Sequence, residues 1–353
     1  MTTDWIDVLI VVVKVVVAFV ILMVATLLLI WAERKVLARM QNRIGPKRAG
    51  PFGLLQSLAD GVKLFFKEPI VPSRVERAIY FAAPIMALIP ALLMFLVVPI
   101  GRPFMIGDRE ITMQAMDLNV GLLFVLAVSS ISVYAVVLAG WSSGSKYPLL
   151  GGVRATAQAI SYEAALGLAL VPVVIYEGTL SIAELVEGQA DSSVGFIPAW
   201  NIILIPSFVF FLVAAIAETN RAPFDMVEAE NELVGGFHTE YSGLRFALFF
   251  LAEYINIFTM SALTASIFLG GWNGPTFDGS LPAWLTWIFP IIWFLLKTSA
   301  IVFVFFWVRA TLPRLRYDQL MELGWKRLIP ATLVWMILSA TAVAWREFGA
   351  PWT

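Results

Sequence analysis

Long apolar segments, each bounded by charged or turn-forming residues, recur along the whole chain. Eight of them have about the 20 residues that an α-helix needs to cross a bilayer. They cover residues 5–32, 78–100, 118–140, 155–176, 200–217, 246–270, 284–308 and 328–345. The pattern predicts an all-α polytopic membrane protein with about eight transmembrane helices, organised as a single integral membrane domain over residues 1–353, with no internal repeat and no separate soluble domain.

The first connection between spans has a second, helical pattern of its own. Gly45-Pro46 and Gly50-Pro51 predict turns, and residues 52–68 then run without a proline until Pro69. One face of this segment is apolar and the other polar: Leu54, Leu58, Val62 and Phe65 against Asp60, Lys63 and Lys67. The pattern predicts an amphipathic helix in the membrane interface on the cytoplasmic side. A plain surface anchor, with its basic residues toward lipid phosphates, is an equal alternative on pattern alone.

Acidic residues are concentrated between the fifth and sixth spans. Residues 217–254 contain seven of the 25 carboxylates of the chain: Glu218, Asp225, Glu228, Glu230, Glu232, Glu240 and Glu253. Pro223 suits the first position of a helix and Gly235-Gly236 suits its end, so a short helix is expected over residues 224–234. On that helix Asp225, Glu228 and Glu232 would share a face, a spacing at which like charges repel in solution.

Apolar residues are interleaved with these carboxylates, which flexible solvated loops rarely allow. We therefore favour carboxylates partly buried in protein at membrane level over a solvated acidic loop. Glu163, about two turns inside the fourth span, and Glu253, inside the sixth, flank the acidic stretch. Ionisable groups inside a membrane mark functional sites, so a proton route is predicted. A structural acid that bonds neighbouring helices is the alternative for Glu163.

Lysine and arginine predict the orientation. The first, third, fifth and seventh connections carry 10, 2, 2 and 5 of them, whereas the second, fourth and sixth carry 2, 0 and 0. By the positive-inside rule the odd connections are cytoplasmic, and both termini face outward. Asp4 and Asp7 precede the first span without a basic region, so a removable signal peptide is not expected. Two basic residues lie within spans, Lys14 and Lys297, and the pattern does not decide which way Lys14 turns.

Composition narrows the chemistry further. Hydrophobic residues make up 60% of the chain and charged residues 14%, and the net charge of −1 gives no indication of nucleic-acid binding. No cysteine and a single histidine, His238, argue against a zinc, iron–sulfur or haem site. We therefore expect no metal site and no catalytic centre in this chain, so that any redox centre belongs to partners.

Four stretches resemble one known family. ERKVLARMQNRIGP, GPFGLLQSLADGVKLFFKEP, AETNRAPFDMVEAENELVGGFHTEYSG and RATLPRLRYDQLM are similar to the quinone-site membrane subunit of respiratory complex I, which in mitochondria is NADH dehydrogenase subunit 1. The similarity covers essentially the whole chain. Ser57 stands where relatives often have proline and Lys47 where they often have asparagine, both peripheral to the chemistry.

The resemblance implies a subunit at the junction of the soluble redox arm and the proton-pumping arm, lining part of a tunnel for ubiquinone or menaquinone. It implies quinone-site residues at Arg34, Asp60, Lys63, Arg221 and Phe224. It implies a proton path through Glu163, Glu218, Asp225, Glu228, Glu230, Glu232, Glu240 and Glu253. NADH, FMN and iron–sulfur clusters would lie on partner subunits.

The implied partners are the quinone-site and iron–sulfur subunits of the soluble arm, the small and antiporter-like membrane subunits, and lipid. A bacterial plasma (inner) membrane is expected, with the mitochondrial inner membrane as the alternative. Two other functions fit the apolar pattern. One is the equivalent subunit of an energy-converting hydrogenase, which need not keep a quinone tunnel. The other is a stand-alone proton-coupled transporter, which would show broken helices at the midplane.

Overall fold

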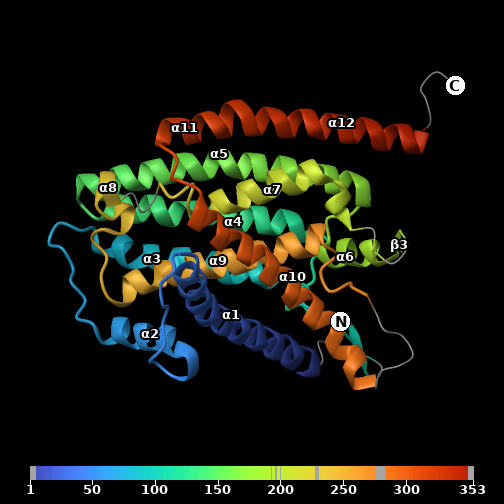
Figure 1. Ribbon diagram of the computed structural model, residues 1–353, viewed down its shortest axis with the longest axis horizontal. Coiled ribbons are helices and arrows are strands. Elements are labelled where there is room, and N and C mark those ends of the chain that lie inside the picture. The colour runs from blue at the N-terminus through green and yellow to red at the C-terminus, as the bar shows by residue number, and fades with distance from the viewer. Residues whose placement is uncertain are drawn as a thin grey trace.

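Apolar helices form the body of the molecule in the order that the hydrophobic pattern predicts (Figure 1). The computed structural model describes residues 5–107, 109–191, 193–194, 197–198, 200–226, 230–275 and 283–348. The apolar helices are α1 (Trp5–Met40), α3 (Arg77–Phe95), α4 (Gly121–Ser142), α5 (Lys146–Glu177), α7 (Ile205–Glu218), α9 (Leu244–Phe268), α10 (Ala283–Thr311) and α12 (Ile329–Phe348). The all-α polytopic prediction is confirmed.

Seven of these helical segments are long and apolar enough to cross a membrane. The exception is α7, which has 14 residues and is therefore only about 21 Å long at 1.5 Å per residue. A bilayer core is about 30 Å thick, so α7 reaches across only part of it. The seventh long segment joins α11 (Tyr317–Met321) to α12 through a π-helix, η4 (Glu322–Leu328).

Short elements lie in the connections. They are η1 (Pro51–Gly53), α2 (Gln56–Phe66), α6 (Ile182–Asp191), η2 (Asn201–Ile203), α8 (Glu230–Leu233) and η3 (Gly236–His238). Two small antiparallel hairpins pair β1 (Phe104–Ile106) with β2 (Arg109–Ile111) and β3 (Ser193–Val194) with β4 (Ile197–Pro198). Phe104 is opposite Ile111 in the first of these.

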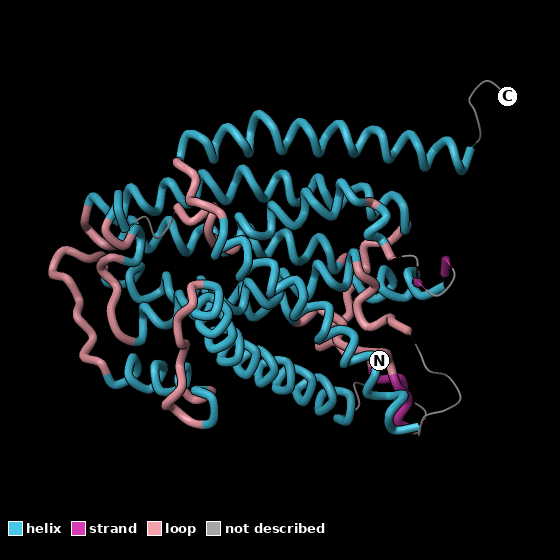
Figure 2. Tube along the Cα trace, in the orientation of Figure 1, coloured by secondary structure: helices cyan, strands magenta, loops and turns pink. Residues whose placement is uncertain are grey.

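The short elements define two ends of the bundle. The α2 end carries α2 and α8, and the α6 end carries α6 and the strands (Figures 1 and 2). The start of α1 and the end of α12 also lie at the α6 end, as expected if all eight apolar helices, the short α7 included, alternate in direction (Figure 1). The grouping agrees with the predicted alternation of connections.

Helix α9 is the centre of the bundle. In its most apolar 18-residue stretch 61% of α9 is buried inside the bundle, whereas in the corresponding stretch of α1 the buried share is 11%. It packs against α1, α3, α7 and α10. Small residues on several faces, such as Ala262, Thr264 and Ala265, are fully buried and let neighbouring helices approach closely. Helix α1 has most of its apolar side chains exposed, as a helix facing lipid or another subunit would.

The amphipathic helix of the first connection is present but shorter than residues 52–68. It is α2, and Phe52 before it adopts a positive φ of 56° that interrupts the helix. Three members of its apolar face, Leu58, Val62 and Phe65, are 50–62% exposed. The helix therefore faces the bundle with the buried Ser57 and the half-buried Asp60, while its apolar side and the two lysines, Lys63 and Lys67, are exposed.

The short helix of the acidic stretch also differs from the sequence prediction. Pro223 lies in a turn and does not begin a helix, and α8 starts only at Glu230. The Pro223 carbonyl accepts a hydrogen bond from the Leu315 amide, and the Phe224 amide bonds to Arg221. The backbone is therefore held in tight turns against the segment that follows α10. Because Asp225 is outside any helix, it does not share a helical face with Glu232; Glu228 lies outside the described residues.

The two lysines within spans have partners at the α6 end. Lys14 Nζ donates to Thr112 Oγ1 at 2.9 Å, so the Lys14 side chain points toward the connection between α3 and α4. Lys297 is 4% exposed, and its ammonium donates to the carbonyls of Leu269, at 2.5 Å, and Gly271, at 3.0 Å, just beyond the end of α9. A cation near a helix C-terminus is stabilised by the unpaired carbonyls there.

Candidate functional site

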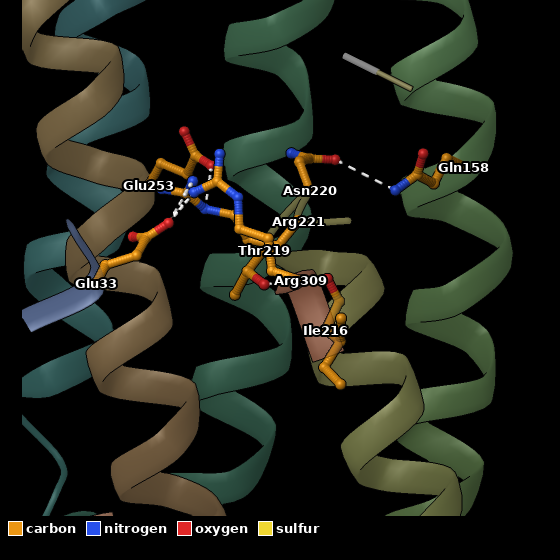
Figure 3. A network of polar contacts seen from close by, with 8 residues as sticks. All are labelled: Glu33, Gln158, Ile216, Thr219, Asn220, Arg221, Glu253 and Arg309. Carbon is orange, nitrogen blue, oxygen red and sulfur yellow. Dashed lines mark hydrogen bonds and ion pairs between the residues drawn. The ribbon is translucent and has the colours of Figure 1, made fainter. Parts of the chain in front are cut away.

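A buried network of ion pairs joins α1, α9, α10 and the loop after α7 (Figure 3). Arg221 Nε lies 2.7 Å from Glu253 Oε1, and Arg221 Nη1 lies 3.7 Å from Glu33 Oε1. Arg309 pairs with the same oxygen of Glu33. Glu33 is 3% exposed and Arg221 5%, whereas the side chains of Glu253 and Arg309 are 19% and 31% exposed, so two buried charges are compensated by two that are partly exposed. We call Glu33, Arg221, Glu253 and Arg309 the junction cluster.

The loop after α7 positions Arg221. Helix α7 ends at Glu218, and Asn220 then adopts a positive φ of 51°, which turns the chain out of the helix. Asparagine tolerates this conformation better than most residues. The Arg221 guanidinium then lies over the Tyr254 ring, 4.5 Å from its centroid, beside the Glu253 carboxylate. Helix α9 therefore supplies both a charge and an aromatic face to one arginine.

A second ion pair connects α1 to α2. Arg34 Nη1 lies 2.5 Å from Asp60 Oδ2, and Gln56 Nε2 donates to the other Asp60 oxygen at 3.1 Å. The two charged side chains are 48% and 32% exposed. Because Arg34 follows Glu33 directly in α1, this partly exposed pair is contiguous with the junction cluster. Together they form a charged zone that runs from the α2 surface into the bundle.

The other quinone-site predictions are placed differently. Lys63 is exposed on α2 and is not one of the residues that pair with Arg34 or Asp60. Phe224 is 5% exposed and packs on Tyr162 of α5, with ring centroids 5.2 Å apart. The structure thus brings Arg34 and Asp60 together, places Arg221 next to them through Glu33, and directs Phe224 toward α5.

Two of the predicted proton-path carboxylates meet between α4, α5 and α7. Ser129 Oγ lies 3.1 Å from Glu218 Oε1 and 3.5 Å from Glu163 Oε1, and Ser130 donates to Glu163. The second Glu218 oxygen is buried without a hydrogen-bond partner among the described residues. A serine hydroxyl donates one hydrogen bond and can accept another, so Ser129 connects the two carboxyl groups when one of them is protonated: it donates to the ionised group and accepts from the protonated one.

One cavity connects Glu218 to the junction cluster. A cavity of about 80 Å³ is lined by both Glu218 and Glu253, together with Asn220, Asn256 and His238. A smaller one, about 30 Å³, lies on the other side of Glu218, toward α5. A cavity of one to a few water volumes lined by polar groups is suited to hold ordered water. Ser129 therefore links Glu163 to Glu218, and a cavity with both polar and apolar lining links Glu218 to Glu253.

His238 closes the cavity from the connection between α7 and α9. Its ring packs against Phe237, Phe246 and Phe250, with centroids 5.2 to 6.4 Å away. Burial among these rings lowers the pKa of His238 to about 4, so the imidazole is neutral at pH 7. It contributes no charge to the cavity and can donate a hydrogen bond from one ring nitrogen and accept one at the other.

The remaining acidic residues are nearer the surface at the α2 end. Glu232 is exposed and pairs with Arg154 at 2.6 Å. Asp225 and Glu240 are half-buried, and the Glu240 carbonyl accepts a hydrogen bond from Tyr80 at 2.8 Å. Glu230 begins α8, but its side chain, like all of Glu228, lies outside the described residues. The acidic stretch therefore divides into a buried part, Glu218 and Glu253, and a more accessible part.

Sequence reasoning missed Glu33 and Arg309. Both stand at the ends of apolar spans, where charges are common, and the sequence by itself suggested only orientation signals. One feature of the sequence could have indicated Glu33: it is an acidic residue directly before Arg34-Lys35, at a helix end where basic residues alone would set the orientation in the membrane. Ser129 and Ser130 were also missed, because serine in a transmembrane helix usually bonds only its own backbone.

Comparisons with known proteins agree with the resemblance of the four sequence stretches. A family model described as NADH dehydrogenase matches residues 13–340. A relative from Frankia casuarinae, described as a subunit of NADH-quinone oxidoreductase, is 52% identical over 328 residues, which make up 93% of this chain and 71% of the relative. Among the described residues no group of three or more histidine or acidic side chains is arranged to hold a metal ion.

Proposed function

This chain belongs to the NADH dehydrogenase family and is a membrane subunit of NADH-quinone oxidoreductase, respiratory complex I; on that premise we propose that it helps form the quinone tunnel and couples quinone reduction to proton movement. The quinone is ubiquinone or menaquinone. The NADH, flavin and iron–sulfur chemistry belongs to partner subunits of the soluble arm. The family assignment favours this function over the hydrogenase-type subunit and the stand-alone transporter.

The observation that carries the proposal is the continuity of charged groups from the surface to the interior. The Arg34–Asp60 pair is partly exposed beside the uncovered apolar side of α2, where an isoprenoid tail and a polar head group would both find suitable contacts. Glu33, next to Arg34, leads to Arg221 and Glu253. From Glu253 the shared cavity leads to Glu218, and Ser129 leads on to Glu163.

Charge changes at one end of such a series are transmitted to the other. Reduction of a quinone takes up two protons and alters the local charge. In a low-dielectric interior, a change of charge shifts the proton affinity of carboxylates several ångströms away. Glu253 and Glu218 line one cavity, and Ser129 lies between Glu218 and Glu163, so a change of charge at Glu253 acts first on Glu218 and through it on Glu163. The protein supplies the path and the electrostatics, and the redox chemistry is that of the cofactors.

The test compares two carboxylates of the acidic stretch. In the complete complex reconstituted in vesicles, Glu218→Gln should lower the rate of NADH-to-quinone electron transfer and the rate of proton translocation together, by roughly tenfold or more, since positioned proton-transfer groups have effects of at least this size. Glu232, which the resemblance also implied for the proton path, is exposed, pairs with Arg154 and is not part of the buried series that we propose, so Glu232→Gln is the matched control and should change both rates much less.

NADH oxidation by an artificial soluble acceptor should be unchanged in both variants, because that reaction does not need this subunit's site. Wild-type electron transfer and proton translocation in Glu218→Gln would remove the carboxylate series from the mechanism. Loss of the artificial-acceptor reaction as well would mean that the variant complex had not assembled, and Ser129→Ala, which removes the link and no charge, then serves as the second variant.

The orientation and the membrane belong to the same proposal. We assign the α2 end to the cytoplasm of a bacterium, because its connections hold most of the lysine and arginine, and the α6 end with both termini to the outer side of the plasma membrane. The soluble arm would then meet the α2 end. The pumping subunits would lie beside the bundle, near Glu163.

A further inference from the structure

Two cavities meet at Glu218, and four residues line both of them. The larger, about 80 Å³, is also lined by Glu253, and the smaller, about 30 Å³, lies against α5. The residues common to both cavities are Ser132, Val136, Glu218 and Asn220. These four side chains therefore form the wall between the two cavities, and we call them the partition.

Glu218 is the only member of the partition that exchanges a proton near neutral pH. Val136 is apolar, and the Asn220 side chain is an amide, which does not titrate in this range. The Ser132 hydroxyl donates its hydrogen to the Ser129 carbonyl at 2.7 Å, so that hydrogen is engaged within α4. A proton that crosses the partition by way of a protein group must therefore use the Glu218 carboxyl group.

The backbone and the side chain of Asn220 are both held in place. Its positive φ of 51° directs the chain out of α7, and its backbone N–H donates to the Ala217 carbonyl at 3.2 Å. The side-chain oxygen faces Gln158 of α5, whose Nε2 lies 3.4 Å away and also donates to the Ala217 carbonyl at 2.9 Å (Figure 3). Gln158 is fully buried, so this contact fixes the Asn220 side chain across the wall between the cavities.

Coupling through Glu218 requires that the partition is closed. A change of charge at Glu253 controls proton movement only if the protons pass through the Glu218 carboxyl group. Each cavity is large enough to hold water, and a gap in the partition would join the two bodies of water. Continuous water conducts protons past Glu218 whatever the charge at Glu253, so electron transfer would no longer be tied to proton movement.

We propose that Asn220 is a positioning residue for proton coupling: its side chain closes the partition, so that protons cross through Glu218 alone. Val136 closes the same wall from α4. The inference rests on the proposed function, because it takes Glu218 as a member of the proton path. It adds the feature that keeps proton movement tied to electron transfer at that point.

The first experiment removes the Asn220 side chain and keeps its turn. Glycine adopts a positive φ without strain, so the loop of Asn220→Gly should be intact. In the complete complex in vesicles, this variant should keep the NADH-to-quinone rate and translocate fewer protons per NADH than the wild type. A wild-type ratio of protons to NADH in Asn220→Gly would overturn the proposal, because glycine serves the turn as well as asparagine does.

Asn42→Gly is the matched control for this substitution. Asn42 also has a positive φ, of 55°, but it is exposed just beyond the end of α1 and lines neither cavity. Its ratio of protons to NADH should equal that of the wild type. A ratio lowered equally in both glycine variants would mean that loop flexibility lowers it, and would also overturn the proposal.

The second experiment leaves the loop unchanged. Val136→Ala shortens a side chain of the partition, whereas Val133→Ala makes the same change in α4 at a residue that lines only the smaller cavity. Val136→Ala should lower the number of protons translocated per NADH, and Val133→Ala should not. Equal ratios in these two variants would overturn the closed partition even if Asn220→Gly failed to assemble.

Glu218→Gln separates this inference from the proposed function. That variant should lower electron transfer and proton translocation together, whereas Asn220→Gly and Val136→Ala should lower only translocation. Wild-type rates in Glu218→Gln would contradict the proposed function and the inference with it. Lowered rates in Glu218→Gln, with wild-type ratios of protons to NADH in Asn220→Gly and Val136→Ala, would contradict the inference alone.

Discussion

The carboxylate of Glu33 is paired with the guanidinium of Arg309, a residue 276 positions away in the chain. Glu33 lies near the end of α1 and Arg309 near the end of α10, and the pair links these two helices at the junction cluster. Glu33 is only 3% exposed, whereas the Arg309 side chain is 31% exposed, so the pair is buried at its carboxylate and partly open to water at its guanidinium. The pair is therefore both a structural contact and part of the environment of Arg221.

Removal of one partner should destabilise the bundle strongly. In Arg309→Gln the buried Glu33 keeps only the more distant Arg221 as an ion-pair partner among the described residues. Removal of one partner of a buried ion pair typically costs about 3–5 kcal/mol of unfolding free energy. The double variant Glu33→Gln/Arg309→Gln should recover part of that loss, since no uncompensated charge remains. Lys326→Gln, which breaks a pair with side chains 75% and 51% exposed, should cost less than about 1 kcal/mol. Thermal unfolding of the subunit in the purified complex measures all three, and an effect of Arg309→Gln as small as that of Lys326→Gln would contradict the buried pair.

The Arg34–Asp60 pair should matter for quinone and little for stability. Asp60→Asn should raise the KM for quinone and lower the NADH-to-quinone rate, while NADH oxidation by an artificial acceptor remains intact. Its partly exposed setting limits the stability effect to about 1 kcal/mol. Asp318→Asn is the matched control, because Asp318 forms an exposed pair with Arg316 at 3.2 Å, outside the predicted tunnel. Equal kinetics for the two variants would separate Asp60 from the quinone site.

His238 should make the subunit sensitive to acid. Its pKa is lowered from 6.5 to about 4 by burial, so between these values the unfolded chain binds a proton that the folded chain does not. The stability contributed by the neutral ring is thus complete above pH 6.5 and is lost as the pH falls toward 4, by about 1 kcal/mol at pH 5.5. The thermal midpoint of the complex at pH 7.5 and pH 5.5 measures the effect. His238→Asn should have a smaller difference between the two pH values than the wild type, and an equal difference would contradict a buried neutral imidazole.

Labelling from outside should distinguish the two ends of the bundle. Ser73 is exposed at the α2 end and Ala190 is exposed on α6, and the chain itself has no cysteine to react. In intact cells an impermeant thiol reagent should modify this subunit in the Ala190→Cys variant and leave it unmodified in Ser73→Cys. A permeant reagent, as the control, should reach any cysteine that partner subunits do not cover. The reverse pattern would overturn the orientation that the lysine and arginine distribution predicts.

Local patterns in the sequence determined the class of the fold and the number of apolar helices. Hydropathy and proline or glycine positions act within one segment, so the eight apolar helices, α2 and the location of both chain ends at one end of the bundle could be predicted without any partner in view, although α7 is shorter than a full span. The same holds for the concentration of carboxylates between residues 217 and 254 and for the position of Glu163 within a span. The four resembling stretches supplied the family, which the comparisons confirm.

Tertiary structure decided which charges meet, because the rotation of each helix about its axis depends on the packing of its neighbours. Glu33 and Arg34 are adjacent in sequence, yet one pairs within the bundle and the other with α2. The contact of Pro223 with Leu315 held residues 223–226 in turns where propensity had suggested a helix. A hydrogen bond or ion pair between distant segments has no counterpart in the local sequence, and for this reason Arg309, Ser129 and the cavity beside Glu218 became visible only in the folded chain.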